Sequence, residues 1–240
     1  MGRTTMRVDP HVHSEASYDG RDPPELLLEQ AATIGLDAIV ITDHDRIGAS
    51  VRAANLAPEF GLVGIPGVEL STAAGHLLGI GIESCPPAGQ PLVDSVRWIR
   101  EAGGAAVVPH PFQRTRHGAR GKQIVAAEPD GIETYNAWLF TGYRNRRAAS
   151  FARRDGYTAL AGSDAHSVAT VGRAFTELTV STQADRLGSS QVVTAIRDGA
   201  TRIEGRRVPF HRAGAHYLKG AARKGIYTLQ RLGAGISPIR

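Results

Sequence analysis

Cysteine is almost absent from this 240-residue chain, which has only Cys85. A single thiol excludes an intrachain disulfide and a multi-cysteine zinc site, and it fits a reducing compartment, so we expect a cytoplasmic protein. Uninterrupted apolar runs of about 18 residues are also missing, so we expect no membrane span. The N-terminus has no apolar signal-peptide segment, and the chain has no Gly-x-Ser-x-Gly motif. Export and serine-hydrolase chemistry are therefore disfavoured.

Positive charge is concentrated at one end of the chain. The net charge is +5, but nine basic residues and one acidic residue follow position 201, so residues 1–201 carry a net charge of −3. The apolar fraction of 42 % and charged fraction of 21 % are typical of a globular domain. We therefore expect one domain at residues 1–201 and a basic extension at 202–240. The extension suits a packed helix, a nucleic-acid contact or a helix on a membrane surface.

Short apolar runs alternate with amphipathic stretches, which is typical of an α/β fold with a mostly parallel sheet or barrel. Helical patterns cover residues 23–35, 92–103, 143–155 and 191–199. We expect strands at residues 6–13, 38–44, 62–69, 75–82, 105–109, 131–136, 158–163 and 175–180. The sequence thus predicts a single barrel-like domain followed by the extension.

Two pairs of potential metal ligands are each two residues apart. His11 and His13 lie on a predicted strand, so both imidazoles point to the same side and can hold one ion. The same spacing recurs in Asp164 and His166, directly after another apolar strand. Because the carboxyl ends of parallel strands meet on one face, we expect both pairs at one site.

Further polar residues stand where apolar runs end, namely Asp43, His44, Glu69 and His110. A buried carboxylate at Glu69 is costly unless it is paired or bound to a cation, so a metal ion is its natural partner. Mixed imidazole and carboxylate ligands suit zinc, manganese or iron(II).

Several short motifs occur in an order that resembles one family. They are D-P-H-V-H-S followed by Tyr18-Asp19-Gly20, then I-T-D-H-D, G-V-E-L-S-T, G-H-L-L-G, H-P-F and G-S-D-A-H. The set resembles the polymerase and histidinol phosphatase (PHP) family of metal-dependent phosphoesterases over residues 6–180. The resemblance implies a distorted (β/α)7 barrel similar to a TIM barrel. It also implies an enzyme that hydrolyses phosphate esters, with the attacking water held between two or three manganese, iron or zinc ions.

The resemblance implies nine metal ligands, and each has a counterpart here. The first ion would be held by His11, His13, Glu69 and Asp164, the second by Glu69, His76 and His110, and the third by Asp19, His44 and His166. His76 has an alternative as an ordinary strand histidine, since His110 could complete the second site with Glu133 or Asn136. With aspartate at position 19, the sequence resembles the branch of the family that acts on nucleotide and short oligonucleotide phosphates.

Four residues are expected to assist the reaction. Asp43, beside His44, is expected to orient a ligand. His166 or a metal-bound water is expected to protonate the leaving group. Arg114 and Arg173 lie on loops that follow ligand strands and are expected to bind phosphate. Plain surface charge is the alternative for both arginines. Arg116, His117 and Arg120 extend the first loop into a basic stretch that could hold a longer substrate, although solvated surface charge is the favoured interpretation.

Three other functions are weighed against this one: histidinol-phosphate phosphatase, amidohydrolase-type C–N hydrolase, and a non-catalytic metal-binding regulatory module. The C–N hydrolase is disfavoured because no lysine lies near the middle of the predicted barrel to bridge two metals. The regulatory module is disfavoured because the ligand set is complete. We expect a phosphorylated small molecule or nucleotide as substrate. For the basic extension a packed helix is favoured, and a nucleic-acid contact is one of the alternatives. The sequence predicts no oligomeric state.

Overall fold

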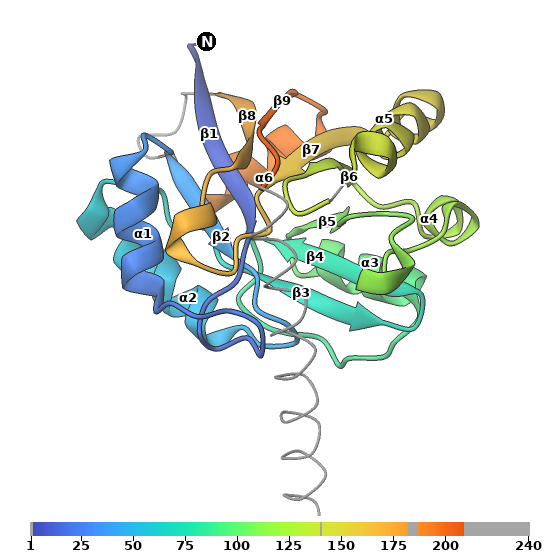
Figure 1. The fold of residues 1–240 in the computed structure, drawn as a ribbon, viewed down its shortest axis with the longest axis horizontal. Helices are drawn as coiled ribbons and strands as arrows, with labels where there is room; N and C mark the ends of the chain where they lie inside the picture. The colour runs from blue at the N-terminus through green and yellow to red at the C-terminus, as the bar shows by residue number, and fades with distance from the viewer. Residues whose placement is uncertain (1, 140, 182–186, 209–240) are drawn as a thin grey trace, which may run out of the picture.

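The structure is a computed structural model that describes residues 2–139, 141–181 and 187–208. The described strands form two sheets (Figure 1). One sheet has the order β2-β1-β8-β9 and contains β1 (Arg3–Val12), β2 (Ala38–Ile41), β8 (Ala174–Ser181) and β9 (Thr201–Gly205). The other runs in sequence order and contains β3 (Gly67–Thr72), β4 (Gly75–Ile80), β5 (Ala105–Val108), β6 (Gly131–Asn136) and β7 (Thr158–Gly162).

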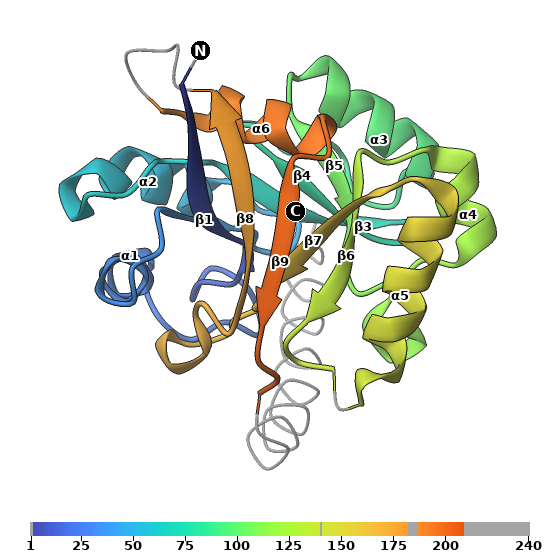
Figure 2. The ribbon, with the colours of Figure 1, turned by 90° about the horizontal axis from the view of Figure 1, so that it is seen from above.

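The helices cover the outside of both sheets (Figure 2). On one side lie α1 (Pro24–Thr33) and α2 (Gly48–Leu56), and on the other lie α3 (Leu92–Glu101), α4 (Gly121–Ala127) and α5 (Gly142–Asp155). α6 (Ser189–Arg197) contacts both β8 and β5. Short 3-10 turns complete the described elements: η1 (Ala57–Phe60), η2 (Arg114–Arg116) and η3 (Val168–Thr170).

The central core lies between the two sheets. Met6 of β1, Leu78 of β4 and Ile196 of α6 belong to one buried apolar cluster. Two further clusters lie under the outer helices, one beneath α3 to α5 and one beneath α1 and α2. β2 and β5 are buried along their whole length, which explains why both read as continuous apolar runs.

The predicted single α/β domain is confirmed, but the expected closed barrel is not. The pairs β1–β2, β5–β6 and β6–β7 are parallel, whereas β3–β4, β4–β5, β1–β8 and β8–β9 are antiparallel. Two residues separate β3 from β4, which is too short for a crossover helix and forces a hairpin. Between the sheets, the isolated bridges recorded in the described residues are Val12 with Ala165 and His44 with Glu69.

Several boundaries differ from those predicted, and two of the differences bear on the fold. The strand expected at 62–69 begins only at Gly67 and continues to Thr72. The expected domain boundary between residues 201 and 202 falls inside β9, which pairs with β8, so the fold continues at least to Gly205. Residues 209–240, most of the expected basic extension, lie outside the described residues. No helix in the described part of the chain combines the length and the hydropathy needed to cross a membrane.

Candidate metal centre

All nine predicted ligands gather at the end of the molecule where the parallel strands finish, and each is at most 8 % exposed. They come from β1 and its following loop (His11, His13, Asp19), from segments after β2, β5 and β7 (His44, His110, Asp164, His166) and from the β3–β4 hairpin (Glu69, His76). The expectation that the pairs two residues apart would converge is therefore confirmed by their positions.

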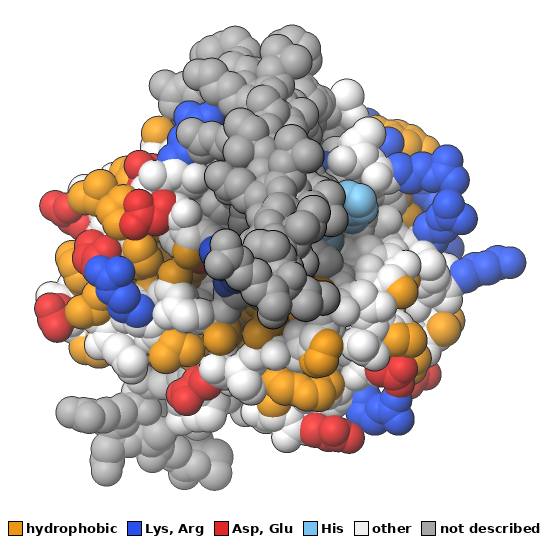
Figure 3. All heavy atoms as spheres, turned by 90° about the horizontal axis from the view of Figure 1, so that it is seen from below, with side chains coloured by type: hydrophobic (Ala, Val, Ile, Leu, Met, Phe, Trp, Pro, Cys, Tyr) orange, Lys and Arg blue, Asp and Glu red, His pale blue; other side chains and the backbone are white. Residues whose placement is uncertain are grey.

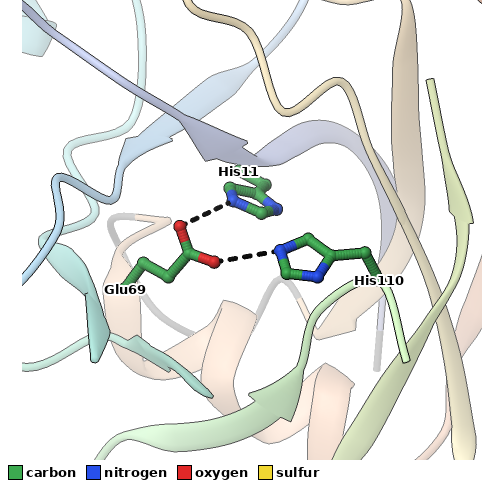
Figure 4. A group of neighbouring side chains, drawn as sticks. All are labelled: His11, Glu69 and His110. Carbon is green, nitrogen blue, oxygen red and sulfur yellow. Dashed lines mark hydrogen bonds and ion pairs between the residues drawn. The ribbon is translucent and has the colours of Figure 1, made fainter. Parts of the chain in front are cut away.

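The carboxylate of Glu69 contacts several of the other predicted ligands, and Figure 4 shows it between His11 and His110. Its Oε1 lies 2.8 Å from Nδ1 of His76 and 3.1 Å from Nε2 of His110. Its Oε2 lies 3.3 Å from Nε2 of His11, from Nε2 of His13 and from Nδ1 of His44. Burial alone would raise the pKa of this carboxyl, but the imidazoles, His76 foremost, hold it well below its usual range. One buried carboxylate thus faces five imidazoles.

Four ligand atoms form a compact group: Nε2 of His11, Nε2 of His13, Oε2 of Glu69 and Oδ1 of Asp164. The two nitrogens are 3.2 Å apart, and they lie 3.5 and 3.4 Å from the Asp164 oxygen. Ligands arranged tetrahedrally around a zinc-sized ion are about 3.4 Å from one another. Within the described residues, Oδ1 of Asp164 is buried and accepts no hydrogen bond. The spacing and this unsatisfied oxygen fit a divalent ion.

Asp19 forms a second side of the cluster. Its Oδ2 lies 3.1 Å from Nε2 of His166 and 3.4 Å from Nε2 of His44. The hydroxyl of Ser17 donates to Oδ1 of Asp19 at 2.8 Å, which fixes the carboxylate plane. Because His44 contacts both Asp19 and Glu69, it connects this side with the central carboxylate.

Asp43 holds the loop that carries Asp19. Its two oxygens accept hydrogen bonds from the backbone N–H and the hydroxyl of Ser14, at 2.7 and 2.6 Å. Gly20 closes the same loop, because a side chain there would overlap the carbonyl of Ser14. Asp43 was expected to orient a ligand. Its hydrogen bonds go to Ser14, in the loop that carries Asp19, and not to a ligand side chain.

Two histidines have their tautomers fixed by neighbours. Nδ1 of His11 lies 3.0 Å from Oε1 of Glu133, and Nδ1 of His166 lies 2.6 Å from the carbonyl oxygen of Asp164. Both partners accept, so each Nδ1 carries a hydrogen, and Nε2 is the nitrogen that faces the cluster and can bind a metal ion once it has lost its proton. Carboxylate and carbonyl partners of this kind orient histidines for metal binding.

The buried carboxylates of this cluster need positive charge nearby to balance them. Burial lowers the pKa of His13, but the carboxylates of Asp19, Asp164 and Glu69 outweigh burial and raise it to about 10. Burial likewise raises the pKa of Asp164, yet Arg116 and the imidazoles hold it well below its usual value. Protons or metal ions can supply the balancing charge, so the two compete for the same atoms.

Glu133 was weighed only as an alternative ligand, and its contacts give it a different place. Besides His11, it accepts hydrogen bonds from the backbone N–H of His110 and from the amide of Asn136, both at 2.8 Å. The same Asn136 amide lies 2.9 Å from Oδ2 of Asp164. Glu133 therefore holds three parts of the cluster together. A carboxylate inside an apolar strand was the sequence signal for it.

We expect Glu133→Gln to weaken metal binding about 10- to 100-fold. Glutamine has one acceptor oxygen and one NH2 group, so it faces either His11 or the His110 N–H donor to donor. In the first case His11 must move its hydrogen to Nε2, which blocks that ligand. Metal titration against a competing chelator measures the change. Glu128→Gln, at an exposed position five residues earlier, is the control, and equal affinities in the two variants would contradict the role of Glu133.

Arg116 reaches the cluster, unlike the two arginines selected from the sequence. Its guanidinium contacts Oδ2 of Asp164, and its side chain is 13 % exposed. Arg114, two residues earlier, is exposed. Neither Arg114 nor Arg173 makes a hydrogen bond or ion pair with the cluster among the described residues. The sequence analysis interpreted the stretch around Arg116 as solvated. The distance along the chain from His110 does not distinguish Arg116 from Arg114.

Two family models match parts of this chain. A family model described as "PHP domain" matches residues 9–84, and one described as "PHP-associated" matches residues 142–201. An uncharacterized protein of Methanocaldococcus jannaschii is 30 % identical over 153 residues, which cover 60 % of this chain and 89 % of that protein.

A 3',5'-nucleoside bisphosphate phosphatase of Chromobacterium violaceum is 35 % identical over 98 residues, which cover 39 % of this chain and 33 % of that protein. Among solved structures, a two-domain protein of Bacteroides vulgatus, described as containing a predicted PHP-like metal-dependent phosphoesterase, matches with a TM-score of 0.69. The match has 20 % identity and covers 85 % of this chain and 66 % of that one. At this identity the likeness concerns the fold alone.

Proposed function

This chain belongs to the PHP family and is an enzyme of the phosphoester-hydrolysing class, and on this premise we propose its reaction. It hydrolyses a phosphate ester at a site with two or three divalent ions. The substrate is a nucleotide, an oligonucleotide end or a small metabolite that carries the phosphate. The observation that carries the proposal is the buried carboxylate of Glu69 facing five imidazoles. Because imidazoles lie beside both of its oxygens, this carboxylate would suit a position between two ions.

The donor atoms divide into three proposed groups. His11, His13, Glu69 and Asp164 would hold the first ion, Glu69, His76 and His110 the second, and Asp19, His44 and His166 the third. Four overlapping sets of three such residues have ligand atoms within 4.8 Å of one another, and His11, His13, His44 and Glu69 each belong to two of the sets. Imidazole and carboxylate donors favour manganese, iron(II) or zinc.

When bound, the ions would lower the pKa of a water and neutralise the phosphate oxygens. The chain contributes the remaining elements. Glu133 keeps the lone pair of His11 directed at the cluster, and Arg116 supplies a guanidinium that can bind two phosphate oxygens. Nε2 of His166, with Nδ1 anchored on a carbonyl, is positioned to pass a proton to the leaving oxygen. Because this same nitrogen is a proposed ligand, it can serve only one role at a time.

The function is tested on protein purified without chelator. Elemental analysis gives the bound metals, and nucleotide phosphates, sugar phosphates, histidinol phosphate and p-nitrophenyl phosphate are screened with manganese, iron(II) and zinc. We expect phosphate release and no hydrolysis of simple amides. Amide hydrolysis without phosphate release would instead support the C–N hydrolase.

We expect Arg116→Ala to lower kcat/KM for p-nitrophenyl phosphate about 100-fold, because the variant loses a charged donor at the reacting phosphate. Arg114→Ala, on the same 3-10 turn, is made in parallel, since the sequence favours that residue instead. Steady-state kinetics with measured metal content separates loss of phosphate binding from loss of metal. A larger loss for Arg114→Ala would return the phosphate-binding role to Arg114.

A further inference from the structure

A groove on the outer surface, between α4 and α5, has a volume of about 650 Å³. Its lining includes the rings of Phe112 and Phe151 and three cationic side chains: Lys122, Arg147 and Arg154. In Figure 3, lysine and arginine side chains gather along the right-hand side of the face, next to a visible histidine. The groove is outside the proposed metal centre.

The positive charge around this groove is poorly balanced. Residues 114–155 contain nine basic and four acidic residues, and of the four, Glu133 lies in the metal centre and Asp130 pairs with Arg100. Arg154 pairs with its neighbour Asp155. Lys122 and Arg147 form no ion pair with any carboxylate of the described residues. Cations without internal partners favour an anionic ligand.

The aromatic rings position the guanidinium groups. Arg147 lies over the ring of Phe112 at 4.3 Å, and Arg154 over that of Phe151 at 5.1 Å. Both rings are only 8 % exposed, so they offer no open surface on which a base could stack. The groove therefore presents N–H donors, which suit phosphate oxygens.

One segment of the chain, from His110 to Lys122, connects the metal centre with the groove. Phe112 follows His110 by two residues, and its carbonyl accepts a hydrogen bond from Arg144 of α5. The segment that follows carries Arg116, which contacts Asp164, and leads to Lys122 in the groove. The same segment thus places one cation, Arg116, against the cluster and another, Lys122, in the groove.

We propose that the groove between α4 and α5 binds the backbone phosphates of a single-stranded oligonucleotide whose terminal phosphate ester lies in the metal centre. Several separate cations call for more than one phosphate. The buried ligands can be reached by a flexible strand end more readily than by the side of a duplex. This inference rests on the proposed function and narrows its substrate class.

The test compares two double variants that remove the same charge. Lys122→Ala with Arg147→Ala empties the groove of two cations, whereas Arg146→Ala with Arg153→Ala removes two arginines of α5 that do not line it. The substrates are a 5'-phosphorylated oligothymidylate, a nucleoside 3',5'-bisphosphate and p-nitrophenyl phosphate. Lys122→Glu, at an exposed position, is a second groove variant with little risk to folding.

We expect the groove variants to raise the ratio of the oligothymidylate KM to the p-nitrophenyl phosphate KM about tenfold at low salt, and the control to leave it unchanged. The slope of log KM against log salt should fall by about 1.4 in the groove double variant, since each lost contact on a single strand removes about 0.7. An unchanged ratio, or an effect confined to the bisphosphate, would overturn the strand site. If the wild-type protein hydrolysed none of the three phosphate substrates, that result would instead overturn the proposed function.

Discussion

Replacing Glu69 by glutamine should remove at least one bound metal and lower kcat by about 1,000-fold or more. Both oxygens of this side chain face imidazoles, so no neighbour can take over the charge. Glutamine keeps the shape but offers one acceptor oxygen, and its NH2 group would face a ligand atom on the other side. The structural cost is small by comparison, since the volume of the side chain hardly changes.

The measurement combines elemental analysis with kcat on p-nitrophenyl phosphate. Glu59→Gln, at an exposed position on η1, makes the same chemical change away from the cluster and should retain wild-type metal content and rate. If Glu69→Gln behaved like Glu59→Gln, the cluster around Glu69 would not be the reaction centre.

Removal of the metals should abolish activity and lower the melting temperature. Asp19, Glu69 and Asp164 lie together in a buried cluster, so bound cations favour the folded state over the unfolded one. At a metal concentration about 1,000 times the dissociation constant, the linkage stabilises the fold by about 4 kcal/mol. For a domain of this size, that corresponds to about 10 °C in Tm.

Chelator dialysis followed by thermal unfolding and an activity assay measures both effects. Adding back manganese, iron(II) or zinc in separate samples should restore the melting temperature and the rate together, and the best metal identifies the preferred ion. Full activity in protein shown by elemental analysis to contain no metal would refute the proposed mechanism.

The composition of the cluster was predictable because histidine and carboxylate residues stand in the sequence where apolar strands end. His11 and His13 share a side by the period of a strand, and the apolar runs before His44 and His110 are the strands that bring them together. Apolar patterning also located β2, β5 and β7, since buried strands leave a continuous run of apolar residues.

The remaining features depend on backbone geometry that residue types do not reveal. His110 and Asp164 adopt left-handed backbone conformations with φ of 29° and 53°, which residues other than glycine seldom do. Such turns redirect the chain where the strands end. Arg114 and Arg116 lie on the same 3-10 turn, and of the two only Arg116 contacts Asp164 among the described residues. β9 was missed because it contains only one apolar residue, Ile203, inside a stretch dominated by positive charge.

The division into two sheets also bears on the order in which the molecule can assemble. β3 to β7 are consecutive in the chain, so their pairings can form while synthesis continues. β1 instead pairs with β8, joining Arg3 to Ser181, and such distant contacts must wait until β8 has been synthesised. His11 and His13 lie on and just after that first strand. A nascent chain therefore carries a half-built centre, and full metal affinity should arise only late in synthesis.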